Sequence, residues 1–163
     1  MDAGIAIGAN VVSALIGRQI LSQAISDASG TIYSSLGDIF YYSANVDKVL
    51  CELDIANKLI TMELLIKELN SHSDCFDEES IHTCLENLHD MIMHIREDLK
   101  QIKEQIEKHK TKYLSKYRSV DVKFQIYNLK LHSKLLLDRY DLLIKTIELT
   151  SLVRNNTKLV KNV

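Results

Sequence analysis

The feature that most constrains the fold is a run of residues between positions 81 and 113 spaced alternately four and three apart. The run comprises Ile81, Leu85, Leu88, Ile92, Ile95, Leu99, Ile102, Ile106, His109 and Tyr113. This spacing is the heptad seam by which one amphipathic helix packs against another. We therefore expect a long helix here, held in a bundle of further helices.

A second run with the same spacing follows a short polar connection, and Ser119 is its expected N-cap. Its members are Val122, Ile126, Leu129, Ser133, Leu136, Tyr140, Leu143, Ile147 and Thr150. Leu135, Leu142 and Leu149 add a second row, which predicts a helix to about Val153 that buries a broad face, as an inner helix does. The short connection predicts an antiparallel pair.

The rest of the chain also favours helices, because it contains no proline, the strongest helix breaker. A helix is expected from Asp38 or Asn45 to Leu69, and its apolar stripe drifts, which predicts neighbours on two sides. Residues 70–79 are expected to form a loop. The predicted fold is an all-α, antiparallel bundle of about four helices, with a body at residues 30–153 and a polar tail at 154–163.

The N-terminal 29 residues are predicted to form an apolar, glycine-bearing helix. All five glycines lie within the first 37 residues, and Ser29-Gly30 and Ser34–Gly37 are expected to interrupt the helix. Apolar side chains surround the helix instead of lining one side, which suits either a buried core helix or a membrane-active one. These packing or membrane residues are Ile5, Ile7, Val11, Val12, Leu15 and Ile16.

The most informative polar feature is a basic run at the end of the helix that carries the seam. It supplies a candidate patch for an anionic partner: Lys108, Lys110, Lys112, Lys116 and Arg118. Three explanations stay open, namely complementation of the helix dipole, binding of anionic lipid headgroups, and binding of nucleic acid. The net charge of −2 disfavours nucleic acid.

Charge is also distributed unevenly along the chain. Residues 1–98 carry 5 basic and 16 acidic residues, whereas residues 99–163 carry 15 and 6. Such a separation is typical of neighbouring helices that neutralise each other, or of a molecule with one end facing an anionic partner.

We expect no catalytic, cofactor-binding or metal site. His72, Cys75, His82 and Cys84 lack the regular spacing of structural zinc sites. The Glu86–His89 step resembles a di-iron motif, but the second such step lies on the same segment instead of a partner helix. No nucleophile elbow or phosphate-binding glycine loop is present. Three cysteines without a secretory signal indicate reduced thiols and a cytoplasmic location.

Five segments carry a resemblance to a known family: GTIYSSLGDIF (30–40), VLCELDIANKL (49–59), CLENLHDMI (84–92), IEKHKTKYLSKYR (106–118) and LLLDRYDLLIK (135–145). They resemble a small, uncharacterised helical family of giant nucleocytoplasmic DNA viruses. The family has tryptophan where Tyr113 or Tyr117 stands, and this chain has none. The resemblance implies a viral origin, in the host cytoplasm or the virion, and no particular activity.

The order of an apolar N-terminal helix and a helical bundle is similar in architecture to HeLo-type and four-helix-bundle membrane executioners. That similarity implies insertion of residues 3–26 into a membrane, with the basic run holding headgroups. The preferred hypothesis is a non-enzymatic assembly or interaction protein that binds a protein partner or forms a homo-oligomer. The alternative is a membrane-binding or membrane-permeabilising protein.

Overall fold

The computed structural model describes the backbone of residues 3–42, 44–71, 79–112 and 119–161, and the side chains of residues 17–42, 44–71, 79–112 and 119–157. These residues form helices α1 (Ala3–Ile39), α2 (Ala44–Leu53), α3 (Ile55–Ser71), α4 (Glu79–Lys110) and α5 (Lys123–Lys161). No strand occurs among the described residues. The prediction of an all-α bundle is therefore confirmed.

α2 and α3 correspond to the single helix expected before the loop, bent at Asp54. This residue has a φ of 48°, in the left-handed region that aspartate tolerates better than most residues. Asn57 Nδ2 donates a hydrogen bond of 2.7 Å to Asp54 Oδ1 at the bend. The bend lets α2 pack against α5 while α3 packs against α1, which confirms the prediction of neighbours on two sides.

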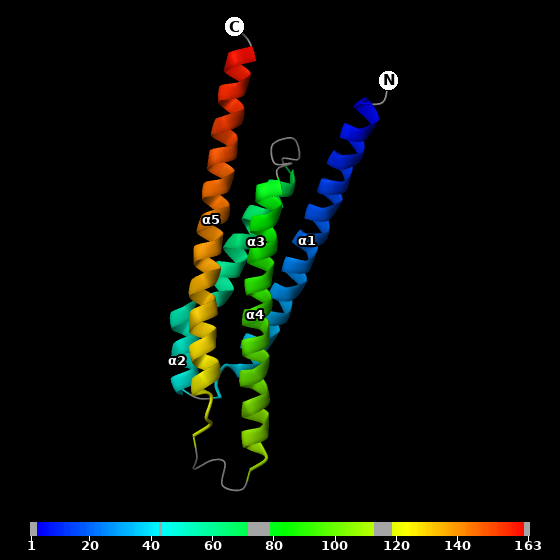
Figure 1. Ribbon diagram of the computed structural model, residues 1–163. Coiled ribbons are helices and arrows are strands. Elements are labelled where there is room, and N and C mark those ends of the chain that lie inside the picture. Colours follow the sequence, from blue (N-terminus) through cyan, green and yellow to red (C-terminus); the bar gives the residue numbers. More distant parts are fainter. Residues whose placement is uncertain (1–2, 43, 72–78, 113–118, 162–163) are drawn as a thin grey trace.

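α1 and α4 run in one direction, α2, α3 and α5 run in the other, and α4 lies between α1 and α5 (Figure 1). α5 follows α4 antiparallel to it, as predicted. Two contacts show that α1 and α4 run in the same direction. A Cβ on Gly17 would lie 3.9 Å from His82, near the start of α4, and Asp38, near the end of α1, pairs with Lys103 near the end of α4. The central helix is thus α4, and α5 lies at the edge.

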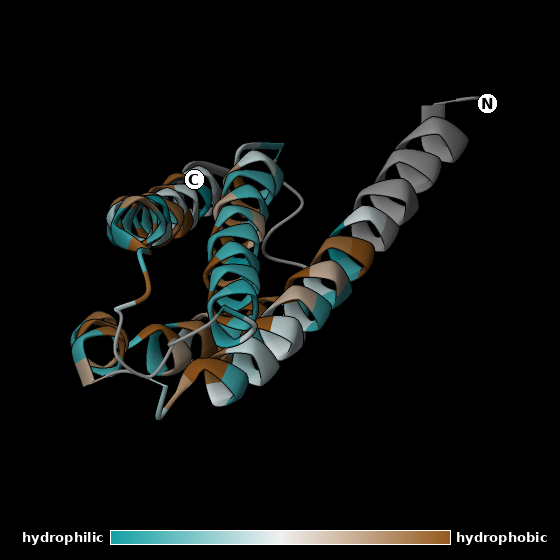
Figure 2. Cartoon of the chain, turned by 90° about the horizontal axis from the view of Figure 1, so that it is seen from below, coloured by the Kyte–Doolittle hydropathy of each residue, from teal (hydrophilic) through white to brown (hydrophobic). Residues whose placement is uncertain are grey.

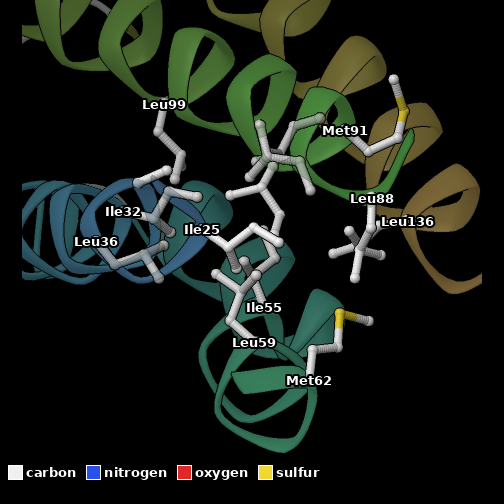
Figure 3. Packing of buried hydrophobic residues seen from close by; sticks show 14 of the residues in the cluster. Ile25, Ile32, Leu36, Ile55, Leu59, Met62, Leu88, Met91, Leu99 and Leu136 are labelled. Carbon is white, nitrogen blue, oxygen red and sulfur yellow. The ribbon is translucent and has the colours of Figure 1, made fainter. Parts of the chain in front are cut away.

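The core is built from the predicted seams. All seam residues of α4 from Ile81 to His109 are buried, whereas Tyr113 lies outside the described residues. Figure 3 shows how Leu88 and Leu99 of α4 meet Ile25 and Ile32 of α1 and residues of α3 and α5. The coloured parts of the helices carry both hydrophobic and hydrophilic residues (Figure 2).

Two predicted interruptions are wrong, since α1 is continuous through Gly30 and Gly37. A glycine inside a helix costs only about 1 kcal/mol relative to alanine. Burial of Ile32, Leu36 and Ile39 offsets that cost, because each buried aliphatic side chain contributes about 1.5–3 kcal/mol.

Three predictions about α5 are also wrong. The helix begins at Lys123, whose backbone N–H lies 3.5 Å from Asp121 Oδ1, so Ser119 is not its N-cap. It continues past Val153 to Lys161. The second row does not broaden the buried face, because Leu142 and Leu149 are 52% and 64% exposed.

Candidate functional site

The predicted packing or membrane residues fall mostly outside the described side chains. Ile5, Ile7, Val11, Val12, Leu15 and Ile16 all precede residue 17, where the described side chains begin. Within the predicted segment 3–26, Ile25 is buried and Ile20 is 66% exposed. From Ile25 onward α1 contributes to the core. In the described part of the chain, no helix has a stretch both long and apolar enough to span a bilayer.

The basic run is described only in part. Lys108, Lys110 and Lys112 are exposed at the end of α4, and Lys116 and Arg118 lie outside the described residues. Lys110 Nζ lies 2.7 Å from Glu107 Oε1 and 5.5 Å from the centroid of the Tyr42 ring. One of the three described lysines is therefore neutralised within the chain, and the other two remain open to solvent.

A hydrogen bond anchors the end of α4 to the connection after α1. The Tyr42 hydroxyl lies 2.8 Å from Nδ1 of His109, whose side chain is buried, and the two rings meet edge to face. The nearby Asp38–Lys103 pair, at 2.5 Å, ties the same ends of α1 and α4. His109 thus lies at the end of the bundle as a hydrogen-bonded residue.

The densest group of titratable side chains lies between α4 and α5. Asp98 is buried, and its Oδ2 lies 2.6 Å from Nδ1 of His132. The ring of His94 stacks on that of His132, with 5.0 Å between centroids. Burial raises the pKa of Asp98, and the hydrogen bond and charge of His132 and the charge of His94 oppose that increase.

The other interhelical polar contacts of α5 follow the same interface. Arg139 Nη1 donates to the Asn87 carbonyl oxygen at 2.6 Å, and Cys84 Sγ lies 3.5 Å from Thr146 Oγ1. The pairing of Asp98 with His132 is not among the sequence-based predictions. Each residue directly precedes a seam position, Leu99 and Ser133, and aligning the two seams antiparallel would have brought them together.

No group of three or more histidine, cysteine or acidic residues suited to a metal ion occurs among the described residues. Cys84 is buried, and His82 Nε2 lies 3.6 Å from Glu86 Oε1. His72 and Cys75 lie outside the described residues. Two of the four residues considered as zinc ligands, His82 and Cys84, are thus described, and each of them contacts another residue.

The largest unexpected feature is an apolar face on α5 that points away from α4. We call it the outer face of α5. Its exposed members retain between 43% and 68% of their accessible surface: Phe124, Tyr127, Leu131, Leu142, Leu149, Leu152 and Val153. Leu135 lies between them and is half-buried. In the row of leucines seven residues apart, Leu142 and Leu149 are therefore surface residues, whereas Leu135 also packs against the core.

A smaller mixed surface lies between α1 and α3. An open groove of about 370 Å³ is lined from α1 by Ser22, Gln23, Ile25 and Ser26 and from α3 by Ile60, Glu63, Leu64, Ile66 and Lys67. Beside it, the Tyr33 hydroxyl donates to Glu63 Oε1 at 3.0 Å. Burial and the neighbouring Glu63 raise the pKa of Tyr33. This groove mixes polar and apolar residues and lacks a continuous apolar row.

Comparison with known proteins gives one informative similarity. No protein family model and no solved structure matches the chain. The uncharacterised protein L717 of Acanthamoeba polyphaga mimivirus is 25% identical over 166 aligned residues, which cover 85% of this chain and 80% of that protein. The chain is therefore similar over most of its length to an uncharacterised protein of a giant virus, in agreement with the resemblance seen in the sequence.

Proposed function

We propose that this protein is a non-enzymatic assembly or interaction protein of viral origin, and that the outer face of α5 is its interaction surface. The observation that carries this proposal is the exposed apolar row from Phe124 to Val153. Large contiguous apolar patches are uncommon on monomeric proteins and typically mark binding surfaces. Burying such a row against a partner contributes about 25 cal/mol per Å² of apolar surface.

The spacing of the row favours a helical partner. Leu131, Leu135, Leu142 and Leu149 recur at intervals of four and seven residues, so they lie along one line of the helix. A line of this kind is what one helix presents to another in a coiled coil or a helix-in-groove complex. The row is about 44 Å long from Phe124 to Val153, at about 1.5 Å per residue.

A non-enzymatic role is supported by the way the chain uses its titratable groups. Asp98 and His132 bond to each other inside the α4–α5 interface, and Tyr42 and His109 bond across the end of the bundle. These are contacts between helices. Catalytic groups, in contrast, converge on a concave pocket that admits a substrate.

The alternative proposal is membrane binding through residues 3–26, as the architecture of HeLo-type proteins implies. Its support within the described residues is the exposure of Ile20. The alternative also requires that the basic run bind anionic lipid headgroups. Gly17 lies beside His82, whereas Lys110 lies beside Tyr42. Gly17 and Ile39, the last residue of α1, are about 33 Å apart at about 1.5 Å per residue, so the two features lie at opposite ends of the part of α1 whose side chains are described.

The proposal is tested by measuring the mass of the full chain by sedimentation velocity over a range of concentrations. We compare the wild type with the double variant Leu142→Gln/Leu149→Gln, which makes the outer face of α5 polar without adding charge. The matched control is Ile60→Gln/Leu64→Gln, which changes two exposed apolar residues of α3. Association that is lost only in the α5 variant supports the proposal.

A wild type that stays monomeric contradicts self-association through the outer face, and an α5 variant that associates as the wild type does contradicts the assignment of that face as the interaction surface. Co-sedimentation with anionic vesicles then tests the membrane alternative, using Ile20→Asp as the variant. If the wild type binds vesicles and Ile20→Asp does not, while the circular dichroism spectrum is unchanged, then α1 is the functional element.

A further inference from the structure

The outer face of α5 carries charges whose sign reverses halfway along the helix. The apolar residues of the outer face form a line along the helix. Five exposed charged residues each stand directly before one of them in the sequence, so all five lie on the same side of this apolar line. Lys123, Lys130 and Lys134 precede Phe124, Leu131 and Leu135, and Asp141 and Glu148 precede Leu142 and Leu149. The first half of this flank is therefore basic and the second half acidic.

These charges are free to meet a partner. None of the five forms an ion pair within the part of the chain that the structure describes, and all five are exposed. The flank lies beside the apolar line on the side of α5 remote from the buried Leu129, Leu136 and Leu143. A helix docked on the outer face would therefore contact this flank as well.

On this basis, and resting on the proposed function of the outer face, we propose that its partner is α5 of a second copy of this chain, packed antiparallel. A two-fold axis between residues 136 and 137 would place Phe124 against the partner's Leu149 and Leu131 against the partner's Leu142. In an antiparallel helix pair, equivalent flanks of the two helices face each other. The basic half of one flank then meets the acidic half of the other.

The charge pairs are compatible with the register of the apolar pairs, which supports this arrangement. With the apolar residues opposed as above, Lys134 lies within two positions of the partner's Asp141, and Lys123 lies within two positions of the partner's Glu148. The three polar residues within the line, Asn128, Asp138 and Lys145, are also accommodated. Lys145 faces the partner's Asn128, and Asp138 lies beside the partner's Lys134.

A parallel pair lacks these complementary contacts. In a parallel pair with a two-fold axis, the flank of one helix lies on the opposite side of the interface from the same flank of the other helix. The basic and acidic halves would then not meet, so the charge complementarity favours the antiparallel partner. The same reasoning predicts a closed dimer, because a two-fold axis makes each copy bury the identical surface.

The orientation is tested by disulfide cross-linking of single-cysteine variants of the full chain. Cys51 and Cys75 are first replaced by serine, and the buried Cys84 is kept. Leu131→Cys and Leu142→Cys are then prepared separately, and each is checked for self-association under reducing conditions. A disulfide needs Cα atoms roughly 4.4–6.8 Å apart, so only facing positions react.

The expected result is a covalent dimer when the two variants are mixed under mild oxidation, and none when either is oxidised alone. Dimers formed by each variant alone would show a parallel pair and overturn the inference, although the outer face would still be the interaction surface. Absence of any cross-link in chains that self-associate would overturn the register. The α3 variant Leu64→Cys serves as the control for random collision.

A charge reversal gives a second measurement that does not depend on cysteine. Lys134→Asp and Asp141→Lys, made singly, should each weaken dimerisation about tenfold, because each places like charges together twice in the dimer. The double variant Lys134→Asp/Asp141→Lys should recover wild-type association. Single variants that associate as the wild type does, or a double variant that stays weak, would overturn the pairing. Self-association that is unchanged when the leucines of the outer face are replaced would instead contradict the proposed function.

Discussion

Nδ1 of His132 lies 2.6 Å from Oδ2 of Asp98, a carboxyl that retains only 5% of its accessible surface. The contact joins α5 to α4 near the middle of their interface, and the ring of His94 stacks on that of His132. A buried carboxylate without a partner is strongly destabilising. The contact with His132 therefore stabilises the Asp98 carboxyl at this buried position.

The first prediction concerns pH. Burial raises the pKa of Asp98 above 3.8, so the folded state keeps this proton to a higher pH than the unfolded chain does. The free energy of unfolding contributed by Asp98 is thus fully present below the unfolded pKa and is lost as pH rises through the raised value. Asp98→Asn should remove this loss. Urea unfolding between about pH 3 and about pH 7 measures the difference from the wild type.

His132→Phe gives the complementary test, because it keeps a ring to stack on His94 but removes the partner of the carboxyl. The pKa of Asp98 should rise further, and the loss of stability should move to higher pH. Asp90→Asn, an exposed change on the same helix, is the control. If Asp98→Asn and Asp90→Asn alter the pH profile equally, the raised pKa of the buried Asp98 does not set the pH dependence of stability.

The second prediction concerns the hydrogen bond at the end of the bundle. Tyr42→Phe removes the hydroxyl that lies 2.8 Å from Nδ1 of the buried His109. The free energy of unfolding should fall by about 0.5–1.5 kcal/mol, the usual net value of such a bond. Urea denaturation checks this. Tyr41→Phe, at a neighbouring ring that is 94% exposed, should have no effect, and an equal loss in both variants would contradict the assignment.

The third prediction concerns glycine within α1. Gly30 is exposed and helical, and a Cβ added there would meet no atom within 4 Å. Gly30→Ala should therefore raise the free energy of unfolding by about 0.5–1 kcal/mol, because alanine has the higher helix propensity. Gly37→Ala is equally open and should act in the same direction. Destabilisation by Gly30→Ala, measured by chemical denaturation, would indicate a break in the helix at this residue.

The fourth prediction tests whether the described part of α1 belongs to the core. Ile25 is buried, so Ile25→Asp should cost about 3–5 kcal/mol for an unpaired buried charge and remove much of the stability of the domain. Thermal unfolding followed by circular dichroism measures this. Ile20→Asp is the matched control, because the residue lies on the same helix and is largely exposed. Both variants unfolding at the wild-type temperature would contradict a core role for α1.

The central helix could be predicted from the sequence because its buried positions keep one spacing from Ile81 to His109. Residues of α1 gave a weaker signal. Serine and glycine near residues 30 and 37 are typical of turns, but intrinsic propensity is a small term that burial of neighbouring residues overrides. Only the packing of Ile32 and Leu36 shows that the helix continues.

The outer face of α5 shows a different limit of sequence analysis. Two rows of leucine run along this helix, one through Leu129, Leu136 and Leu143 and one through Leu135, Leu142 and Leu149. Periodicity establishes that both rows are apolar, but it cannot tell how many neighbours the helix has. Because α5 lies at the edge of the bundle, the first row is buried, whereas Leu142 and Leu149 of the second row are exposed.

The parallel course of α1 and α4 has a consequence for the order of folding. The α4–α5 pair is closed by residues 111–122 alone, whereas α1 reaches α4 only after residues 40–78 have turned back through α2 and α3. Closing the longer segment costs about 1 kcal/mol more in chain entropy. We expect the α4–α5 hairpin to form first and α1 to dock onto it afterwards. Pulsed hydrogen exchange would then detect protected amides in α4 and α5 before those of α1, and the reverse order would exclude this route.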